Sequence, residues 1–332
     1  MKKILNNPES YVDEMLDGLV IAHGDELRRL GDDGRVIARS GGAIPGKVGI
    51  VTGGGSGHLP VFLGYVGDGL LDACAVGNVF AGPRVSDCQL AAQAAHGGAG
   101  VLQLYGNYGG DRMNFDMAQE FLALDGVEVA SVRVADDVAS APPAERSKRR
   151  GVAGMVYAFK IAGARAAQGG SLAEVAAAAQ KAALACRSIG VALSPCVVPE
   201  SGKASFTISD QEIEFGMGIH GEPGIWRGLM KSADALADEM LDHLLPELPL
   251  DRGSRVAVLV NSLGATPHEE LYILYRRVAQ VLAQRGVSPV MPLVGRYATS
   301  MEMAGASLTL MPLDDELERL LKAPAQCPFW RV

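Results

Sequence analysis

The chain has 332 residues and a formal net charge of −8, and 48% of its residues are hydrophobic, 20% charged and 5% aromatic. This composition is typical of a globular α/β protein and excludes a disordered or fibrous chain. The acidic balance argues against a nucleic acid or an anionic membrane as partner, because clustered Lys and Arg bind both. The one basic run, residues 147–150, is predicted to be a solvated turn without a function.

The cysteine spacing and the lengths of the apolar runs indicate in which compartment of the cell the protein is expected. Five cysteines form an odd set without a short pairing or a metal-type spacing, which predicts reduced thiols. The first residues lack the apolar core of a signal peptide, and no stretch reaches about 18 uninterrupted apolar residues. We therefore expect a cytoplasmic protein that is neither exported nor membrane-spanning.

Strands and helices alternate in the first half of the chain. Asn7 followed by Pro8 predicts a helix start. Ser171 opens a capping box for a helix that ends near Ser188, and another helix is expected over residues 151–168. Apolar runs predict strands at residues 47–52, 73–76, 101–105 and 127–134. This alternation predicts a mostly parallel sheet.

The pattern changes after Gly190, which is predicted to stop the preceding helix. Thr266 begins a second capping sequence, for a helix that reaches about Gln284. Extended segments or strands are predicted at residues 191–198, 212–215, 255–260, 287–294 and 307–311. We therefore expect an α/β fold with two α/β domains, residues 1–190 and 191–332, each with a mostly parallel or mixed sheet flanked by helices.

Two glycine-rich segments are similar to nucleotide loops but lack essential features. Residues 52–58 follow a buried strand, where α/β sheets place ligands, and we expect a loop there. His58 stands where the dinucleotide pattern needs a glycine. Residues 41–48 fit the phosphate loop except that they end in Val48, where a hydroxyl residue belongs. The sequence therefore shows no nucleotide loop of its own.

Two further segments carry candidate catalytic side chains. Asp111 lies in a glycine-rich segment, residues 105–115, after a predicted strand. Such an aspartate is more often a turn former or a helix cap than a base. His220 is flanked by glycines within residues 214–224, which argues against a histidine packed in the core. It could carry protons, bind a metal or act as a nucleophile, and the spacing does not choose between these roles.

The ordered motifs of the chain resemble the dihydroxyacetone kinase family, in particular its DhaK subunit or first kinase domain. They are G-G-G-S-G-H, N-Y-x-G-D-x-x-N-F, R-R-G-V-A, G-I-H-G-E-P-G and N-x-L-G-A-T-P. The resemblance implies a substrate-binding subunit in which the histidine of G-I-H-G-E-P-G holds a ketone carbon as a hemiaminal. That role falls on His220. Because a polyol offers no carbonyl carbon, covalent capture would select ketoses.

The resemblance also implies roles for other residues. Asp111 would be the base that takes the proton of the attacking hydroxyl, and His58 its partner in hydrogen bonding or proton acceptance. Gly55, Ser56 and Gly57 would line the same pocket.

Gly106 departs from the family pattern, since many members carry a lysine before the Asn-Tyr pair. We predict that the glycine enlarges the pocket. A four-carbon ketose such as erythrulose would then be preferred to dihydroxyacetone.

No metal or cofactor is expected on this chain. The resemblance implies a separate nucleotide-binding subunit of the DhaL type that carries ADP or ATP with Mg, and in some systems a phosphotransferase-system phosphocarrier recharges it. It also implies a homodimer of this chain.

Two other interpretations stay open. A metal-dependent hydrolase or lyase would use His58, Asp111 and His220 as ligands. A non-catalytic ketose-sensing regulatory protein would need the covalent anchor but no base.

Overall fold

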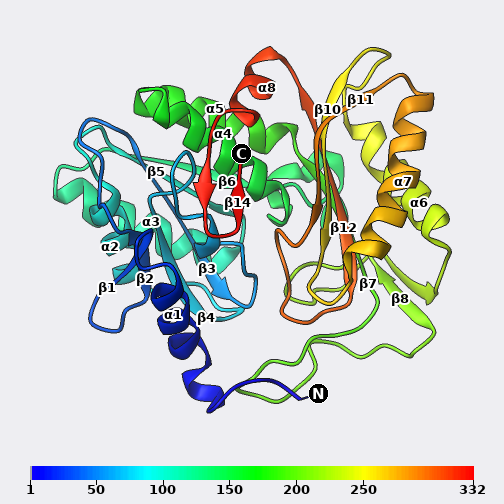
Figure 1. Ribbon diagram of the computed structural model, residues 1–332, viewed down its shortest axis with the longest axis horizontal. Coiled ribbons are helices and arrows are strands. Elements are labelled where there is room, and N and C mark those ends of the chain that lie inside the picture. The colour runs from blue at the N-terminus through cyan, green and yellow to red at the C-terminus, as the bar shows by residue number, and fades with distance from the viewer. Residues whose placement is uncertain (1) are drawn as a thin grey trace.

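The computed structural model describes residues 2–332, which form two six-stranded sheets and a short two-stranded one (Figure 1). The strand order is β1-β2-β4-β3-β5-β6 in the first sheet and β11-β10-β12-β7-β8-β9 in the second. The strands are β1 (Leu27–Leu30), β2 (Val36–Arg39), β3 (Gly49–Ser56), β4 (Ala73–Val79), β5 (Val101–Gly106), β6 (Val129–Val134), β7 (Arg187–Ala192), β8 (Glu212–Phe215), β9 (Trp226–Leu229), β10 (Arg255–Ser262), β11 (Ser288–Gly295), β12 (Gly305–Leu313), β13 (Gln326–Cys327) and β14 (Trp330–Arg331).

The helices form layers around these sheets. Helices α2 and α3 pack on one face of the first sheet, α4, α5 and α8 lie between the two sheets, and α6 and α7 cover the outer face of the second (Figure 1). In residues 2–332, no helix has the length and apolarity needed to cross a membrane. The helices are η1 (Pro8–Ser10), α1 (Tyr11–Ala22), η2 (Leu63–Tyr65), α2 (Val85–Ala95), α3 (Gly109–Leu124), η3 (Pro143–Lys148), α4 (Gly154–Ala167), α5 (Leu172–Ala185), α6 (Ala233–Leu244), η4 (Leu245–Glu247), α7 (His268–Gln284) and α8 (Asp315–Leu321).

The pairing of the strands confirms the predicted fold class. In the first sheet β3 lies parallel to β4 and β5, and β5 lies parallel to β6. In the second sheet β10 and β11 are parallel and the other pairs are antiparallel. The chain passes from one sheet to the other between β6 and β7, and one hydrophobic core joins α4 and α5 to strands of both sheets. The division into two domains at residue 190 stays a prediction.

Local capping signals predict some helix starts and fail at one. The side chain of Asn7 accepts a hydrogen bond from the Glu9 N–H at 3.1 Å, and the Ser171 capping box is present. The capping sequence predicted at Thr266 is wrong, because its hydroxyl accepts the N–H of Gly305 at 2.7 Å. Helix α7 therefore begins without a side-chain cap.

Two predicted boundaries are also wrong. Residues 52–56 are not a loop, because β3 continues through them and pairs with β4, with one register shift between Gly55 and Ser56. A Cβ at Gly54 would collide with the ring of Phe62, so the glycine allows close packing of a strand rather than a turn. The helix that begins after Ser171 ends at Ala185, and Gly190 lies within β7, which pairs with β12.

The basic run at residues 147–150 is not simply a solvated turn. Arg149 is fully buried and donates to both carboxylate oxygens of Glu247 at 2.7 Å. Arg187 donates to the same carboxylate at 3.0 Å, and Arg146 lies 3.5 Å from it. Burial acts to raise the pKa of Glu247, but these hydrogen bonds and charges lower it overall. Three guanidinium groups thus share one carboxylate.

Replacing Glu247 with alanine is expected to lower the free energy of unfolding by about 3–5 kcal/mol, because removal of one partner leaves buried charges uncompensated. Urea denaturation at neutral pH measures the change. Asp242→Ala, on the exposed surface of α6, removes a carboxylate without this cluster and is expected to change the stability by less than about 0.5 kcal/mol. Equal effects of the two substitutions would contradict a structural role for the shared carboxylate.

Candidate active site

His58 lies just beyond β3, where the chain turns at Gly57. Gly57 has φ +101°, which favours glycine, and its carbonyl accepts the Met301 N–H at 2.7 Å. The His58 ring is fully buried, with Nδ1 2.7 Å from the carbonyl oxygen of Thr299. Because a carbonyl only accepts, Nδ1 carries the proton and Nε2 keeps its lone pair. The Nε2 atom has no hydrogen-bond partner among residues 2–332.

The protonation of His58 follows from this environment. Burial lowers the pKa of His58 to about 3, and the neighbouring His220 acts in the same direction. The ring is therefore neutral at physiological pH, and its Nε2 is an acceptor.

His220 lies in the loop between β8 and β9. Glu222 makes two hydrogen bonds with His220: Oε1 lies 3.0 Å from Nδ1, and Oε2 accepts the His220 backbone N–H at 3.0 Å. In the neutral ring the Nδ1–H therefore faces the carboxylate, and Nε2 holds the lone pair. The side chain is 22% exposed.

The carboxylate of Glu222 is kept ionised by its neighbours. Burial acts to raise the pKa of Glu222, but the hydrogen bond and charge of His220, together with the charge of Arg150, lower it to about 2. Arg150 is itself held by Asp137 at 2.7 Å. The arrangement fixes the orientation of the His220 ring through a permanently charged partner.

Asp111 lies in the first turn of α3, a helix that the sequence pattern did not predict. It is 7% exposed, and its Oδ1 has no hydrogen-bond partner among the described residues. Burial raises the pKa of Asp111 to about 6, and the charge of nearby His220 acts against this shift. Gly82 faces the free oxygen, since a Cβ there would lie 2.7 Å from Oδ1. A carboxylate with this pKa is suited to act as a base near neutral pH.

Aromatic rings enclose the two histidines. The His58 and His220 ring centroids lie 4.7 Å apart in an edge-to-face arrangement. Phe80, with φ +57°, stacks on His58 at 5.0 Å and meets the edge of His220 at 5.6 Å. The Tyr108 ring lies 4.7 Å from that of His220, and its buried hydroxyl has no partner in the part of the chain that the structure describes. The structure thus brings together His58 and His220, which are far apart in the sequence.

The predicted lining residues support the site through their backbone. Gly55 and Gly57 pack against Phe80, where a Cβ would come within 2.8 Å of it. The Ser56 hydroxyl donates to the Gly77 carbonyl at 2.8 Å. These residues position Phe80 beside His58. Whether they contact a substrate stays a prediction.

Gly106 is enclosed by other side chains. A Cβ at this position would lie 3.2 Å from the Met155 sulfur and 3.2 Å from the Tyr108 ring. The glycine therefore gives space to Tyr108, which in turn faces His220. The predicted enlargement of the pocket is not visible at Gly106 itself.

Sequence reasoning assigned no role to three residues of this site. Glu222 and Tyr108 lie within the motifs that carry the resemblance, two residues from His220 and Gly106 respectively, so their positions carried a signal. Phe80 follows β4, and its position in the sequence gave no signal of a role, because only the fold brings it to His58. No group of three His, Cys, Asp or Glu side chains in residues 2–332 could hold a metal ion.

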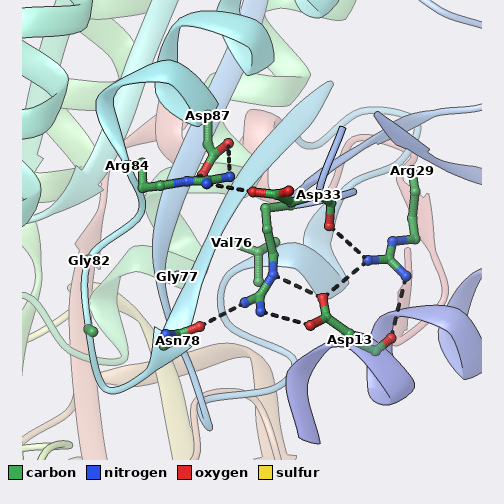
Figure 2. Close-up of a pocket in the computed structure, with 11 residues that line it drawn as sticks. Asp13, Arg29, Asp33, Val76, Gly77, Asn78, Gly82, Arg84 and Asp87 are labelled. Carbon is green, nitrogen blue, oxygen red and sulfur yellow. Dashed lines mark hydrogen bonds and ion pairs between the residues drawn. The ribbon is translucent and has the colours of Figure 1, made fainter. Parts of the chain in front are cut away.

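A cavity of about 490 Å³ opens at the end of β4 and reaches Gly82 (Figure 2). Gly82 in turn lies next to Asp111. Arginine and aspartate side chains pair across it. Arg84 donates to Asp87 at 2.9 Å and to Asp33 at 2.5 Å, and Arg35 donates to Asp13 at 3.1 Å. The positive charges of this cavity, which we call the paired cavity, are thus matched by carboxylates.

The chain matches known proteins over nearly its whole length. The family model described as the Dak1 domain matches residues 17–329. The dihydroxyacetone-binding subunit DhaK of a PTS-dependent dihydroxyacetone kinase 2 from Listeria innocua is 46% identical, over all of both chains. An L-erythrulose kinase from Pectobacterium atrosepticum is 44% identical over all of this chain but only 56% of its own length.

Solved structures show the same fold. The crystal structure of the dihydroxyacetone kinase of C. freundii superposes with a TM-score of 0.90 and 35% identity, over 99% of this chain and 60% of that one. A dihydroxyacetone kinase operon co-activator, DhaQ, superposes with a TM-score of 0.87 and 31% identity, over 94% of this chain and 96% of its own. This chain thus spans about three fifths of the longer kinases it matches. It belongs to the dihydroxyacetone kinase family, as a Dak1 domain of the DhaK type.

Proposed function

We propose that this chain is the ketose-binding subunit of a dihydroxyacetone-type kinase. It would hold a short ketose as a hemiaminal on Nε2 of His220 and present the terminal hydroxyl for phosphorylation. The observation that carries the proposal is the hydrogen bond between His220 Nδ1 and Glu222. It leaves Nε2 as the free nucleophile beside His58. The DhaK subunit and the erythrulose kinase among its relatives support the substrate class.

Capture of the ketose would proceed by addition to its carbonyl carbon. The lone pair of His220 Nε2 forms the C–N bond, and the π electrons of the C=O bond move to oxygen, which takes a proton from solvent. The positive charge left on the ring faces the carboxylate of Glu222, which stabilises it. Covalent attachment fixes the hydroxyl that reacts next and reduces the entropy lost in the transfer.

The phosphorylation step would use Asp111 as base and His58 as a hydrogen-bond acceptor. The free Oδ1 of Asp111 takes the proton of the attacking hydroxyl as the phosphoryl group arrives. The lone pair on His58 Nε2 accepts a hydrogen bond from the substrate and orients it. No cofactor is assigned to this chain. A nucleotide with Mg would lie on a separate subunit of the DhaL type. A phosphotransferase-system phosphocarrier would recharge that subunit in a PTS-dependent scheme, the kind that the name of the Listeria relative gives for that protein.

Mass spectrometry tests the proposal. Intact protein incubated with dihydroxyacetone and measured by native mass spectrometry is expected to gain the mass of one ketose. Glycerol at the same concentration is the control and is expected to give no adduct. Phosphorylation of the ketose by this chain together with a nucleotide-binding subunit completes the test. No adduct and no turnover would reject the proposal.

A regulatory ketose sensor is the second candidate, because the operon co-activator DhaQ shares the fold. A sensor needs the covalent anchor and no base. The buried, unpartnered Oδ1 of Asp111 close to His220 favours catalysis. An adduct on His220 without phosphorylation by any nucleotide-binding subunit would favour the sensor.

Substrate preference provides a separate prediction, centred on Gly106. We expect a higher kcat/KM for one erythrulose enantiomer than for dihydroxyacetone. Gly106→Lys would press on Tyr108 and Met155 and is expected to shift the ratio towards dihydroxyacetone by about tenfold or more, because the larger ketose differs by one carbon and loses more from a narrower pocket. Gly109→Lys, where the structure leaves open space, is the matched control. A wild-type preference for dihydroxyacetone would contradict the prediction.

A further inference from the structure

A second cavity, of about 610 Å³, lies beside the edge strand β6 and between α3, η3 and α5. Five cationic side chains line it and no acidic one, in a protein whose net charge is −8. We call it the basic cavity. Its lining residues are Asn107, Arg112, Ser131, Arg133, Ala135, Arg146, Ser147, Lys148, Gln180, Ala183, Leu184 and Arg187.

Neighbouring carboxylates do not neutralise all of the positive charge of the basic cavity. Lys148 pairs with Glu145, but Arg146 and Arg187 share Glu247 with the buried Arg149 behind them. Arg112 and Arg133 have no ion pair within residues 2–332. The paired cavity differs in this respect, since each of its arginines meets an aspartate (Figure 2). An unmatched group of guanidiniums around a concave surface is suited to an anion.

The walls of the basic cavity are held by hydrogen bonds. The Asn107 amide donates to the carbonyls of Ser147 and Arg149 at 2.9 and 2.7 Å, which fixes η3 to the end of β5. Arg187 has a side chain only 6% exposed and donates to the Leu184 carbonyl at 2.9 Å. Arg187 and the backbone of η3 are thus fixed before any ligand arrives.

The place of the cavity in the fold also favours a ligand. Asn107 and Ala135 directly follow the parallel strands β5 and β6, and open α/β sheets bind ligands outside the carboxyl ends of such strands. The volume falls within the range of small-molecule sites. Guanidinium groups bind phosphate oxygens in a bidentate manner, which makes arginine the usual residue for phosphate recognition.

We propose that the basic cavity binds a small molecule that carries one or more phosphate groups, at a site separate from His220. Arg112, Arg133 and Arg146 contact the phosphate oxygens, and the buried Arg187 adds a fixed positive charge. The occupancy of this site does not require the ketose adduct.

Isothermal titration at constant ionic strength tests the proposal with three probes: inorganic phosphate, ADP and dihydroxyacetone phosphate. At least one is expected to bind saturably, and their relative affinities identify the source of the phosphate. Arg133→Gln and Arg146→Gln are each expected to weaken binding about tenfold or more, as loss of a hydrogen bond to a charged group does. Arg276→Gln, an exposed arginine on α7 paired with Asp234, is the matched control and should leave the affinity unchanged.

The mass of the ketose adduct on His220 serves as an independent readout. The adduct is expected to form to the same extent in Arg133→Gln and in the wild type. This result would show that the variant is folded and that the cavity is a separate site. The proposal would be overturned if none of the three probes bound saturably. It would also be overturned if the Arg133 and Arg146 variants bound the probes as tightly as the wild type does. A loss of protein-partner binding in Arg133→Gln without any binding of the probes would overturn it as well, since the cavity would then be a docking surface.

Discussion

A His220→Gln variant is expected to form no ketose adduct and to lose phosphorylation by about a thousandfold or more, because both capture and orientation of the substrate depend on the same ring nitrogen. Glutamine keeps a polar side chain next to Glu222 but has no nucleophilic nitrogen. Intact-protein mass spectrometry measures the adduct, and a coupled assay with a nucleotide-binding subunit measures turnover.

The control for this variant is His96→Gln, at the end of α2 and outside the site. It is expected to retain both the adduct and the activity of the wild type. An adduct of full occupancy in His220→Gln would place the nucleophile elsewhere and contradict the proposed mechanism. Retained adduct in Glu222→Gln with slower formation would agree with an orienting role for that carboxylate.

Asp111→Asn is expected to lower kcat by about 10²–10⁴-fold while the adduct still forms, because the amide cannot take the proton of the attacking hydroxyl. In the wild type, activity should rise with pH through about 6, as Asp111 becomes ionised. The Asn variant should lose this limb of the pH profile. Asp116→Asn, exposed on the same helix, is the matched control and should keep both rate and profile.

Asp111→Asn is expected to raise the stability of the protein, although it lowers the activity. Burial raises the pKa of Asp111 above its ordinary value, so the wild type loses stability as pH rises from about 4 through about 6. Above pH 6 the Asn variant should therefore be the more stable protein, by up to about 3 kcal/mol. Urea denaturation at pH 4 and pH 7.5 measures the difference. A variant that is less stable at both pH values would show that the carboxylate is structural.

The sequence pattern predicted the elements whose signals are local. The capping box at Ser171 and the apolar run of β5 depend on neighbours in the chain and were confirmed. The strand character of residues 52–56 could not be read locally, because glycines are frequent in loops and pairing with β4 decides their conformation.

The candidate site shows the same division. The motifs indicated His58, Asp111 and His220 one by one, and the resemblance grouped them. The contact of the His58 ring with His220 depends on the meeting of two sheets, and the place of Phe80 depends on the turn after β4. Such contacts between distant segments are set by tertiary packing, on which periodicity and propensity carry no information.

Gly57 and His58 are attached to the segment that precedes β12 by three hydrogen bonds: His58 Nδ1 with the Thr299 carbonyl, the Thr299 N–H with the His58 carbonyl, and the Met301 N–H with the Gly57 carbonyl. Any local opening that separates these segments releases the imidazole and exposes the two amides together. Deuterium uptake at Thr299 and Met301 should therefore report, without any substrate, how often the molecule visits an inactive form.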